Sequence, residues 1–413
     1  MMQPLTAVFL LLLLLAVACR LWLLARQIGR VRAERERVPP AFAGAIPLAA
    51  HQKAGDYTIA HARLSAVEAV LDALVLAAIT WGGGLAALDQ WWRQWSLGGV
   101  WLGVAVILSL YLCIAVIGWP LSLYRLFGIE ARFGFNRMTW KLYVADLLKG
   151  LVLGLALGVP LLAAILWLMI SGGRHWWLYA WLVWAAFSLL LAWAYPVLIA
   201  PLFNRFRPVS DVELARRLES LVSRCGFASR GVFVMDGSRR SAHGNAYFTG
   251  LGAQKRIVLF DTLLERLSGA EVEAVLAHEL GHFRLRHVRK RLVLNLGAGL
   301  AALFVLAWLA QWPPFYAAFG APLPSAHVAL ILFALTLPIV TFWLAPLAAA
   351  WSRRHEYEAD EFARRHSDAR ELASALVKLY RENATTLTPD ALYSAFFDSH
   401  PPATLRIARL TAT

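Results

Sequence analysis

The sequence predicts a mainly helical protein that crosses a membrane about seven times and gathers its polar regions into one domain outside the bilayer. Of the 413 residues, 59% are hydrophobic and 18 are tryptophan, which is too apolar a composition for an ordinary soluble surface. Only 16% are charged, yet the formal net charge is +14. The basic residues border apolar runs and form no single basic domain, so we expect contact with a lipid bilayer and not with a nucleic acid.

Seven segments are apolar enough to cross a bilayer, which takes about 20 helical residues. They are Leu5–Ala25, Leu64–Leu88, Leu97–Tyr124, Asp146–Ile170, Trp176–Phe203, Leu292–Trp312 and His327–Trp351. The first could instead be a cleaved signal peptide ending near Cys19. No Lys or Arg precedes it, however, and its apolar run continues to Ala25, so a retained helix is expected. The second carries Glu68 and Asp72, and charges within a span usually face a bundle interior or a wet cavity.

The loops between these segments differ in charge and predict the orientation of the chain. Arg residues gather after the first, third and fifth segments and in the C-terminal tail, whereas the alternate loops hold few basic residues. Because cytoplasmic loops are enriched in Lys and Arg, the N-terminus is expected outside and the C-terminus in the cytoplasm. Abundant Ala, Leu and Arg favour a bacterial source, hence a multi-pass protein of the inner membrane. The three cysteines form no disulfide pattern, which fits a reducing compartment.

The predicted organisation alternates membrane and polar regions. Residues 1–203 hold five spans, 204–291 a first polar region, 292–351 two more spans and 352–413 a second polar region. Both polar regions fall on the cytoplasmic side, so the last two spans must bring them together. In the first region, Gly231–Met235 is typical of a strand. The alternating segments Asn245–Thr249 and Arg256–Phe260 flank Gly250-Leu251-Gly252 and predict a hairpin.

A metal-binding pattern lies on the helix that follows this hairpin. Ser268-Gly269-Ala270-Glu271 is a capping box that begins the helix. Within it, His278 and His282 are four residues apart and share one helical face, so both imidazoles can reach one metal ion. Glu279 lies beside them and can take a proton from a zinc-activated water. Two imidazoles and a carboxylate suit Zn²⁺, one ion per chain, with a fourth position open.

The third metal ligand is expected among the acids that follow the last span. Glu356 and Asp360 are four residues apart on one helical face, so one can bind metal while the other accepts the N–H of a ligand histidine. We expect Glu356 as the ligand, because Asp360 has the shorter side chain. Glu358 lies about 200° around the helix from Glu356 and is expected to be solvated. A solvated helix end is the ordinary interpretation of such acids, and only the HExxH pattern argues against it.

Two further residues near the motif have open roles. Gly281 within the helix costs about 1 kcal/mol relative to alanine. It either admits another element close to the metal or is simply tolerated. His287 lies five residues beyond His282, about 140° around a continuous helix. It is expected at the membrane edge or behind a ligand, and not on the metal.

The ordered motifs resemble those of the type 1 CAAX prenyl protease family, seven-span membrane zinc metalloendopeptidases. The resemblance covers nearly the whole chain. The motifs that carry it are His-Glu-Leu-Gly-His at 278–282, Glu-Tyr-Glu-Ala-Asp at 356–360, Glu-Ala-Arg-Phe-Gly-Phe-Asn at 130–136, Asn-Ala-Tyr-Phe at 245–248, and Ser-His-Pro-Pro at 399–402 with Arg406. The fold class that it implies is a polytopic helical protein with a cytoplasmic, zincin-like metallopeptidase domain that contains a small β-hairpin or sheet.

The resemblance also implies roles for individual residues. Asn245, Ala246 and Tyr247 are similar to the strand edge along which the family's peptide or protein substrates lie. His400 and Arg406 resemble an active-site pair that positions substrate and stabilises the oxyanion. Asp360 matches the acid that supports a ligand histidine. Without the resemblance, His400 is a loop histidine and Arg406 a charge on a helix surface.

Two other functions compete with an active prenyl-protease-like enzyme. A quality-control protease for membrane proteins would use the same chemistry on other substrates. A transporter or lipid-binding scaffold with a degenerate site would explain Glu68 and Asp72 inside a span. Against the scaffold, every catalytic position is filled. Bacteria generally lack protein prenylation, so the physiological peptide is not specified by the resemblance.

Overall fold

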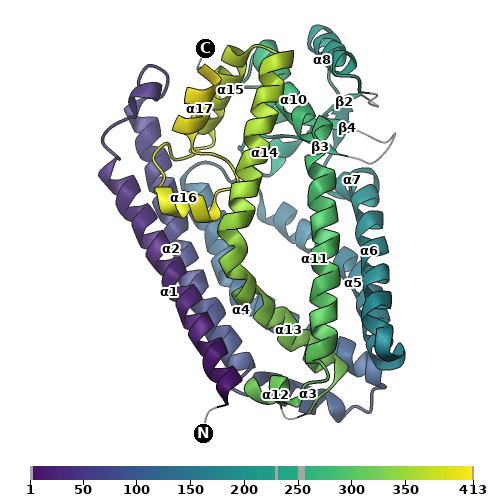
Figure 1. The fold of residues 1–413 in the computed structure, drawn as a ribbon. Coiled ribbons are helices and arrows are strands. Elements are labelled where there is room, and N and C mark those ends of the chain that lie inside the picture. Colours follow the sequence, from purple (N-terminus) through teal and green to yellow (C-terminus); the bar gives the residue numbers. More distant parts are fainter. Residues whose placement is uncertain (1–2, 228–230, 250–255, 322, 412–413) are drawn as a thin grey trace.

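A computed structural model describes residues 3–227, 231–249, 256–321 and 323–411. Long helices run between two ends of the molecule, with the N-terminus at one end and the C-terminus at the other (Figure 1). The small sheet and the helices of both polar regions lie together at the C-terminal end (Figure 1). The membrane part and the polar part are thus stacked along one axis.

The membrane part is built from long apolar helices and a few short connecting ones. These are α1 (Pro4–Ala33), α2 (Leu48–Ile79), α3 (Gly84–Arg93), α4 (Gly99–Leu123), α5 (Trp140–Ser171), α6 (Trp176–Ala194), α11 (His287–Leu309), α12 (Pro313–Ala318) and α13 (Ala326–Thr341). The short α7 (Ala200–Phe203) ends the span that contains α6. The polar part holds α8 (Val212–Arg224), α9 (Asp261–Leu264), α10 (Gly269–Arg284), α14 (Ala345–His366), α15 (Ala369–Glu382), α16 (Ala391–Phe397) and α17 (Ala403–Thr411).

Six helices of the described part are long and apolar enough to cross a membrane, and α2 with α3 makes up to seven as a pair bent by 49°. The expectation of one continuous second span was therefore wrong. The break follows from the glycine triplet that begins at Gly82, where Gly83 takes a φ of +77° as the residue before α3. A left-handed backbone is accessible to glycine, and here it redirects the chain between the end of α2 and the start of α3.

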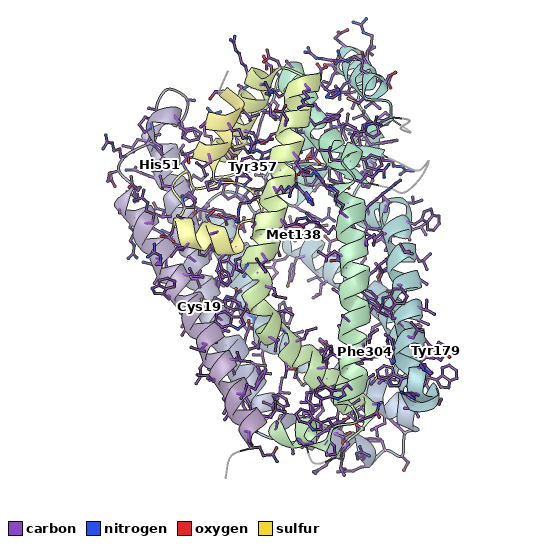
Figure 2. All side chains as sticks on the ribbon, viewed as in Figure 1. Cys19, His51, Met138, Tyr179, Phe304 and Tyr357 are labelled. Atoms are coloured by element: carbon purple, nitrogen blue, oxygen red, sulfur yellow. The ribbon has the colours of Figure 1, made fainter. Side chains whose placement is uncertain are left out.

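Large apolar side chains remain exposed on the outside of these helices, as a lipid-facing surface requires. Tyr179 of α6 is 47% exposed and Phe304 of α11 is 56% exposed. Both lie in the half of the molecule away from the sheet (Figure 2). Inside, side chains such as Val106 and Leu332 are fully buried in a separate apolar core. This distribution fits a bundle that is solvated by acyl chains.

The sheet of the polar part has four strands in the order β1-β2-β4-β3. These are β1 (Phe206–Pro208), β2 (Val232–Met235), β3 (Ala246–Thr249) and β4 (Arg256–Phe260). β2 and β4 are parallel, and the other neighbours are antiparallel. The predicted strand and hairpin are confirmed, although the connecting glycines at 250–252 lie outside the described residues. β3 is an edge strand, and its outer side lies at the site described below.

A second apolar core joins this sheet to the helices of both polar regions. Its fully buried members include Leu218 of α8, Leu259 of β4, Leu280 of α10 and Leu372 of α15. α14 packs along α10 and follows α13 through a short 3-10 turn at Phe342–Leu344. The helix that carries the downstream acids is therefore the direct extension of the last membrane span.

Candidate active site

The helix α10 presents both histidines of the HExxH pattern and is anchored at its start. Ser268 accepts a hydrogen bond from the Glu271 amide, and Glu271 accepts one from the Ser268 amide, as the capping box predicts. The buried Glu271 carboxylate also accepts hydrogen bonds from Ser374 and Lys378 of α15, each at 2.7 Å. The capping residue thus ties the motif helix to the C-terminal region.

Gly281 permits the close approach of α14. A Cβ at this position would lie 3.0 Å from the Cα of Ala359, 3.1 Å from its carbonyl oxygen and 3.1 Å from the Cβ of Phe362. These distances are shorter than ordinary van der Waals contacts, and two of the atoms belong to backbone. The glycine is therefore required by helix packing, which decides between the two interpretations left open by the sequence.

Three predicted ligands meet between α10 and α14. The Nε2 atoms of His278 and His282 are 3.1 Å apart. The carboxylate of Glu356 lies 3.5 Å from the first and 3.2 Å from the second. The buried Glu356 Oε2 has no hydrogen-bond partner, and a bound cation would satisfy such an oxygen. Two imidazoles and a carboxylate form the donor set that zinc prefers, so the residues fit a metal ion.

Asp360 and Arg406 lie behind this group. Asp360 Oδ1 is 2.8 Å from Nδ1 of His278, which leaves Nε2 facing Glu356. The guanidinium of Arg406 donates to both oxygens of Asp360 at 2.7 Å. Burial opposes a charge on His278, but the two carboxylates outweigh it and raise the pKa of His278 to about 9 without a metal. Asp360 therefore sets the orientation of one predicted ligand.

Glu279 lines a cavity of about 340 Å³ next to the predicted ligands. Burial raises the pKa of its carboxyl above the usual value, which suits a group that accepts and returns a proton near neutral pH. The same cavity is lined by Asn245 and Ala246, by His278 and Glu356, and by His400 and Arg406. The folded chain thus brings residues from separate segments of the sequence together as the lining of one cavity.

His400 and Arg406 both approach the carboxylate of Glu356. Nε2 of His400 is 3.6 Å from Oε1, and Nη1 of Arg406 is 3.6 Å from Oε2. The two residues differ in environment, since the His400 side chain is 65% exposed and Arg406 is buried. His400 is accessible to a bound molecule, whereas Arg406 is enclosed by its ion pairs.

The segment 245–247 lies along the edge of the sheet. The Asn245 carbonyl accepts the Phe260 amide, so the alternation of an antiparallel ladder points the main-chain groups of Ala246 away from β4. The Asn245 side chain accepts the Ala246 amide at 2.8 Å. Tyr247 packs against Met235 and Phe260 and does not line the cavity. A molecule in the cavity would meet Tyr247 only through its main chain.

Two cavity residues carried no signal in the sequence. Asn383 forms two hydrogen bonds with the backbone of Gly244, at 3.0 and 3.2 Å, and so supports the strand edge. Tyr380 lines the same cavity one helical turn earlier on α15. Tyr380 lies in α15, an amphipathic helix without a sequence motif, and Asn383 directly follows that helix as its C-cap. Only the packing of α15 against α10 places them at the site.

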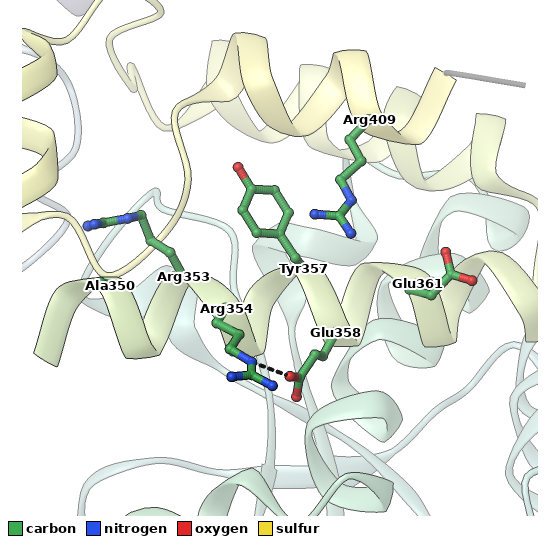
Figure 3. A pocket seen from close by; sticks show the side chains of 7 residues that line it. All are labelled: Ala350, Arg353, Arg354, Tyr357, Glu358, Glu361 and Arg409. Carbon is green, nitrogen blue, oxygen red and sulfur yellow. Dashed lines mark hydrogen bonds and ion pairs between the residues drawn. The ribbon is translucent and has the colours of Figure 1, made fainter. Parts of the chain in front are cut away.

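Glu358 was expected to be a solvated charge, and this expectation was wrong. One oxygen is 2.9 Å from Nε of Arg354, one turn earlier on α14 (Figure 3). The other lies 3.0 Å from Nε2 of His287. His287 in turn is 3.0 Å from His282 through their Nδ1 atoms. The error arose because the helical-wheel argument considered only α14 and could not include a partner from the start of α11.

Comparison with known proteins agrees with this arrangement. Residues 27–205 match the model of the CAAX prenyl protease N-terminal region with five membrane helices, and residues 208–413 match that of peptidase family M48. A CAAX prenyl protease 1 homolog of Arabidopsis thaliana is 38% identical over 301 residues, covering 70% of this chain and 68% of that protein. The chain belongs to peptidase family M48.

Further relatives and a solved structure extend the match. CAAX prenyl protease 1 of Saccharomyces cerevisiae is 36% identical over 70% of this chain and 68% of its own length. The crystal structure of S. mikatae Ste24p superposes with a TM-score of 0.91 at 28% identity, covering 99% of both chains. This protein of family M48 is therefore a multi-pass membrane metalloprotease that acts on peptides or proteins, and its family implies a metal ion.

The family assignment argues against the hypothesis of a non-catalytic transporter or lipid-binding scaffold. Glu68, one of the charges on which that hypothesis depended, pairs with Arg125 through two contacts of 2.6 Å. Such pairing compensates a charge in a membrane helix without a transported ion. The charge thus has a structural explanation that fits a protease.

Proposed function

We propose that this protein is a zinc endopeptidase that hydrolyses extended peptide segments at the cytoplasmic face of a bacterial inner membrane. One observation carries the proposal: His278, His282 and Glu356 offer ligand atoms within 4.8 Å of one another, and Glu279 lines the adjoining cavity. The other group of this composition in the described chain, His287, His355 and Glu358, does not line that cavity. The site residues and the metal are inferred from this arrangement, and the membrane side is inferred from the Arg-rich loops.

The three ligand residues would hold one zinc ion, which when bound lowers the pKa of water and polarises a carbonyl group. Glu279 accepts the proton of the attacking water and returns it to the leaving amine, for which its raised pKa is suited. Asp360 accepts the Nδ1 proton of His278, so that the Nε2 lone pair faces the ion. Glu279 thereby changes protonation state during the reaction, whereas His278 and Asp360 keep theirs.

His400 is the residue best placed to act on substrate. It lines the cavity, and its exposed side chain can donate a hydrogen bond to the developing oxyanion. Arg406 is buried and donates to both oxygens of Asp360. We therefore assign Arg406 to holding Asp360 and Glu356 in place, with its positive charge close to the reacting carbonyl.

The edge of β3 would bind the peptide backbone. The outward carbonyl of Ala246 can accept a hydrogen bond from an added strand. The Ala246 amide can donate to the same peptide once the Asn245 side chain, which accepts that amide, turns toward the peptide as well. A second cavity of about 560 Å³ shares Tyr380, Asn383 and His400 with the first. The two cavities together accommodate an extended chain on both sides of the scissile bond.

Replacement of Glu279 tests the mechanism. Glu279→Gln should abolish hydrolysis of an internally quenched, unstructured peptide and retain zinc, because Glu279 is the base and not a ligand. His278→Ala should lose both activity and zinc, because two ligands do not complete the site. The measurements are zinc content by mass spectrometry and peptide turnover in detergent. Wild-type turnover by zinc-loaded Glu279→Gln would refute the mechanism.

The inactive variant also identifies the substrate. Glu279→Gln should retain bound peptides that the active enzyme releases as products, and mass spectrometry of the co-purified material gives their sequences. Comparison of one carboxyl-terminal peptide with and without a prenyl group then tests the activity for which the eukaryotic relatives are named. Recovery of fragments from many unrelated membrane proteins would instead identify a quality-control protease.

A further inference from the structure

A second cluster of metal-binding residue types lies directly behind the proposed ligand His282. It consists of His287, His355 and Glu358, whose ligand atoms also lie within 4.8 Å of one another. His287 and His355 are buried, and Glu358 is one-third exposed. The cluster belongs to neither the cavity nor the first metal group, so its role has to be derived from its own contacts.

The contacts form a chain that begins at His282. Nδ1 of His282 is 3.0 Å from Nδ1 of His287, and Nε2 of His287 is 3.0 Å from Oε2 of Glu358. The other oxygen of Glu358 is held by Arg354 at 2.9 Å. Each link has hydrogen-bond length, and the chain leaves Nε2 of His282 facing His278 and Glu356.

The proposed metal at His282 determines every proton in this chain. A histidine that binds zinc through Nε2 carries its proton on Nδ1. That proton can only be donated to His287 if Nδ1 of His287 is unprotonated. His287 then carries its own proton on Nε2, where it is donated to Glu358. The carboxylate thus acts on His282 through an intervening imidazole.

The backbone between α10 and α11 is shaped for this contact. α10 ends at Arg284, and Arg286 adopts a left-handed conformation with φ 60° before α11 begins at His287. A non-glycine residue takes up this conformation at an energetic cost. The turn breaks the helix so that His287 contacts His282, which a continuous helix would not allow.

A second metal ion fits the cluster poorly. The rings of His287 and His355 are stacked, with centroids 3.9 Å apart and planes inclined by only 11°. Zinc lies about 2.0–2.1 Å from a ligand nitrogen and close to the ring plane, so one ion cannot lie in both parallel planes. It would also have to displace the proton that His287 donates to Glu358. The geometry favours a hydrogen-bonded chain, with His355 as its packing support.

We propose that His287 and Glu358 are positioning residues that hold His282 in its metal-binding tautomer and orientation. The inference rests on the proposed zinc site and adds two residues to it. It also gives the two ligand histidines matching supports, Asp360 directly for His278 and Glu358 through His287 for His282. The chain of contacts joins α10, α11 and α14 behind the metal.

The test compares two replacements of His287 by zinc affinity, measured by competition with a chromophoric chelator. His287→Leu removes both hydrogen bonds and should weaken zinc binding about 10–100-fold. His287→Gln supplies an amide oxygen for His282 and an amide N–H for Glu358, so it should recover most of the affinity. Glu358→Leu should resemble His287→Leu, whereas Glu358→Gln, which retains an acceptor, should lose less.

Unfolding of the metal-free variants separates positioning from general damage. Equal melting temperatures of His287→Leu and His287→Gln, with unequal zinc affinity, support the proposal. Equal affinity of His287→Leu and wild type overturns it, as does a Gln variant that binds zinc as weakly as the Leu variant. If His287→Leu does not fold, the Glu358 pair provides the same comparison.

Two controls separate the positioning role from a second metal site and from failure of the first one. His355→Phe retains the stacked ring without nitrogen atoms and should bind one zinc ion with wild-type affinity. Two zinc ions per wild-type chain, one of them lost in His355→Phe, would overturn the proposal in favour of a second metal site. His282→Ala should lose tight binding. If it does not, the proposed zinc site itself is wrong, whereas loss in His282→Ala but not in His287→Leu refutes only the positioning role.

Discussion

At the scale of single residues, Gly281 shows how packing overrides intrinsic preference. Alanine is favoured over glycine inside a helix by about 1 kcal/mol. A Cβ at Gly281 would nevertheless press on the backbone of Ala359 at 3.0 Å, three residues from Glu356 on α14. Overpacking of this kind costs about 1–3 kcal/mol, so it outweighs the gain in helix propensity.

Gly281→Ala should therefore destabilise the protein and weaken zinc binding, because α14 must move away from α10 and take Glu356 with it. The measurements are thermal unfolding in detergent and zinc competition. Gly297→Ala is the matched control, since a Cβ there meets no atom within 4 Å. It should be neutral or stabilising. Equal behaviour of the two variants would show that the close approach of α14 is not required.

Glu356 and Asp360 show how the position of an acid along one helix decides its predicted role. Glu356 points toward both Nε2 atoms, whereas Asp360 reaches Nδ1 of His278. Asp360 has a side chain one methylene group shorter and lies one helical turn later. It therefore supports a ligand histidine, whereas Glu356 is predicted to bind the metal itself. Assignment of Glu356 as the ligand remains a prediction, which zinc content of Glu356→Ala and Asp360→Asn can check alongside the variants above.

At the scale of elements, Glu271 connects the start of α10 to α15. Burial alone would raise the pKa of its carboxyl, but the contacts with Lys378, Ser374 and the Ser268 amide hold it below the usual value. A carboxyl with a lowered pKa in the folded state contributes stability that is present above its unfolded pKa of about 4.3. That contribution is lost as the pH falls through the lowered folded pKa.

Glu271→Ala should reduce the free energy of unfolding by about 1–3 kcal/mol at neutral pH, because it removes hydrogen bonds to a charged group. Glu271→Gln should keep the helix cap and lose the ion pair. The difference between wild type and Glu271→Gln, measured on metal-free protein, should shrink as the pH falls below about 4. A difference that is constant as the pH is lowered through this range would contradict this role of the ionised carboxylate.

At the scale of the whole molecule, the arrangement requires both polar regions on one side of the membrane. They form one core around the sheet at the C-terminal end of the molecule (Figure 1). Arg residues gather in the loops of this end, which the positive-inside rule assigns to the cytoplasm. The N-terminus lies at the opposite end (Figure 1).

A fluorescent protein fused to the C-terminus should therefore be active, and alkaline phosphatase fused at the same point should be inactive, because folding of these reporters depends on the compartment. A phosphatase inserted after α12, at the opposite end of the molecule, should be active. The reverse pattern would exclude the proposed cytoplasmic site while leaving the protease assignment intact.

Local patterns in the sequence predicted much of the molecule. The apolar runs identified the membrane segments, and the capping box with its i, i+4 histidines identified α10, because each depends on spacing within one element. The same spacing placed Glu356 and Asp360 on one face of α14. Where a local signal was misjudged, as at the glycine triplet that bends the second span, the responsible residues were still present in the sequence.

The tertiary structure decided the contacts between distant elements. Glu358 meets His287 across 71 positions in sequence, and Gly281 meets Ala359 because α14 packs on α10. The edge of β3, the support from Asn383 and the position of Tyr380 depend in the same way on packing. The period of a helix predicts which side chains share a face, but it does not predict which other element packs against that face. The packing partner is determined when the apolar faces of all elements are buried together.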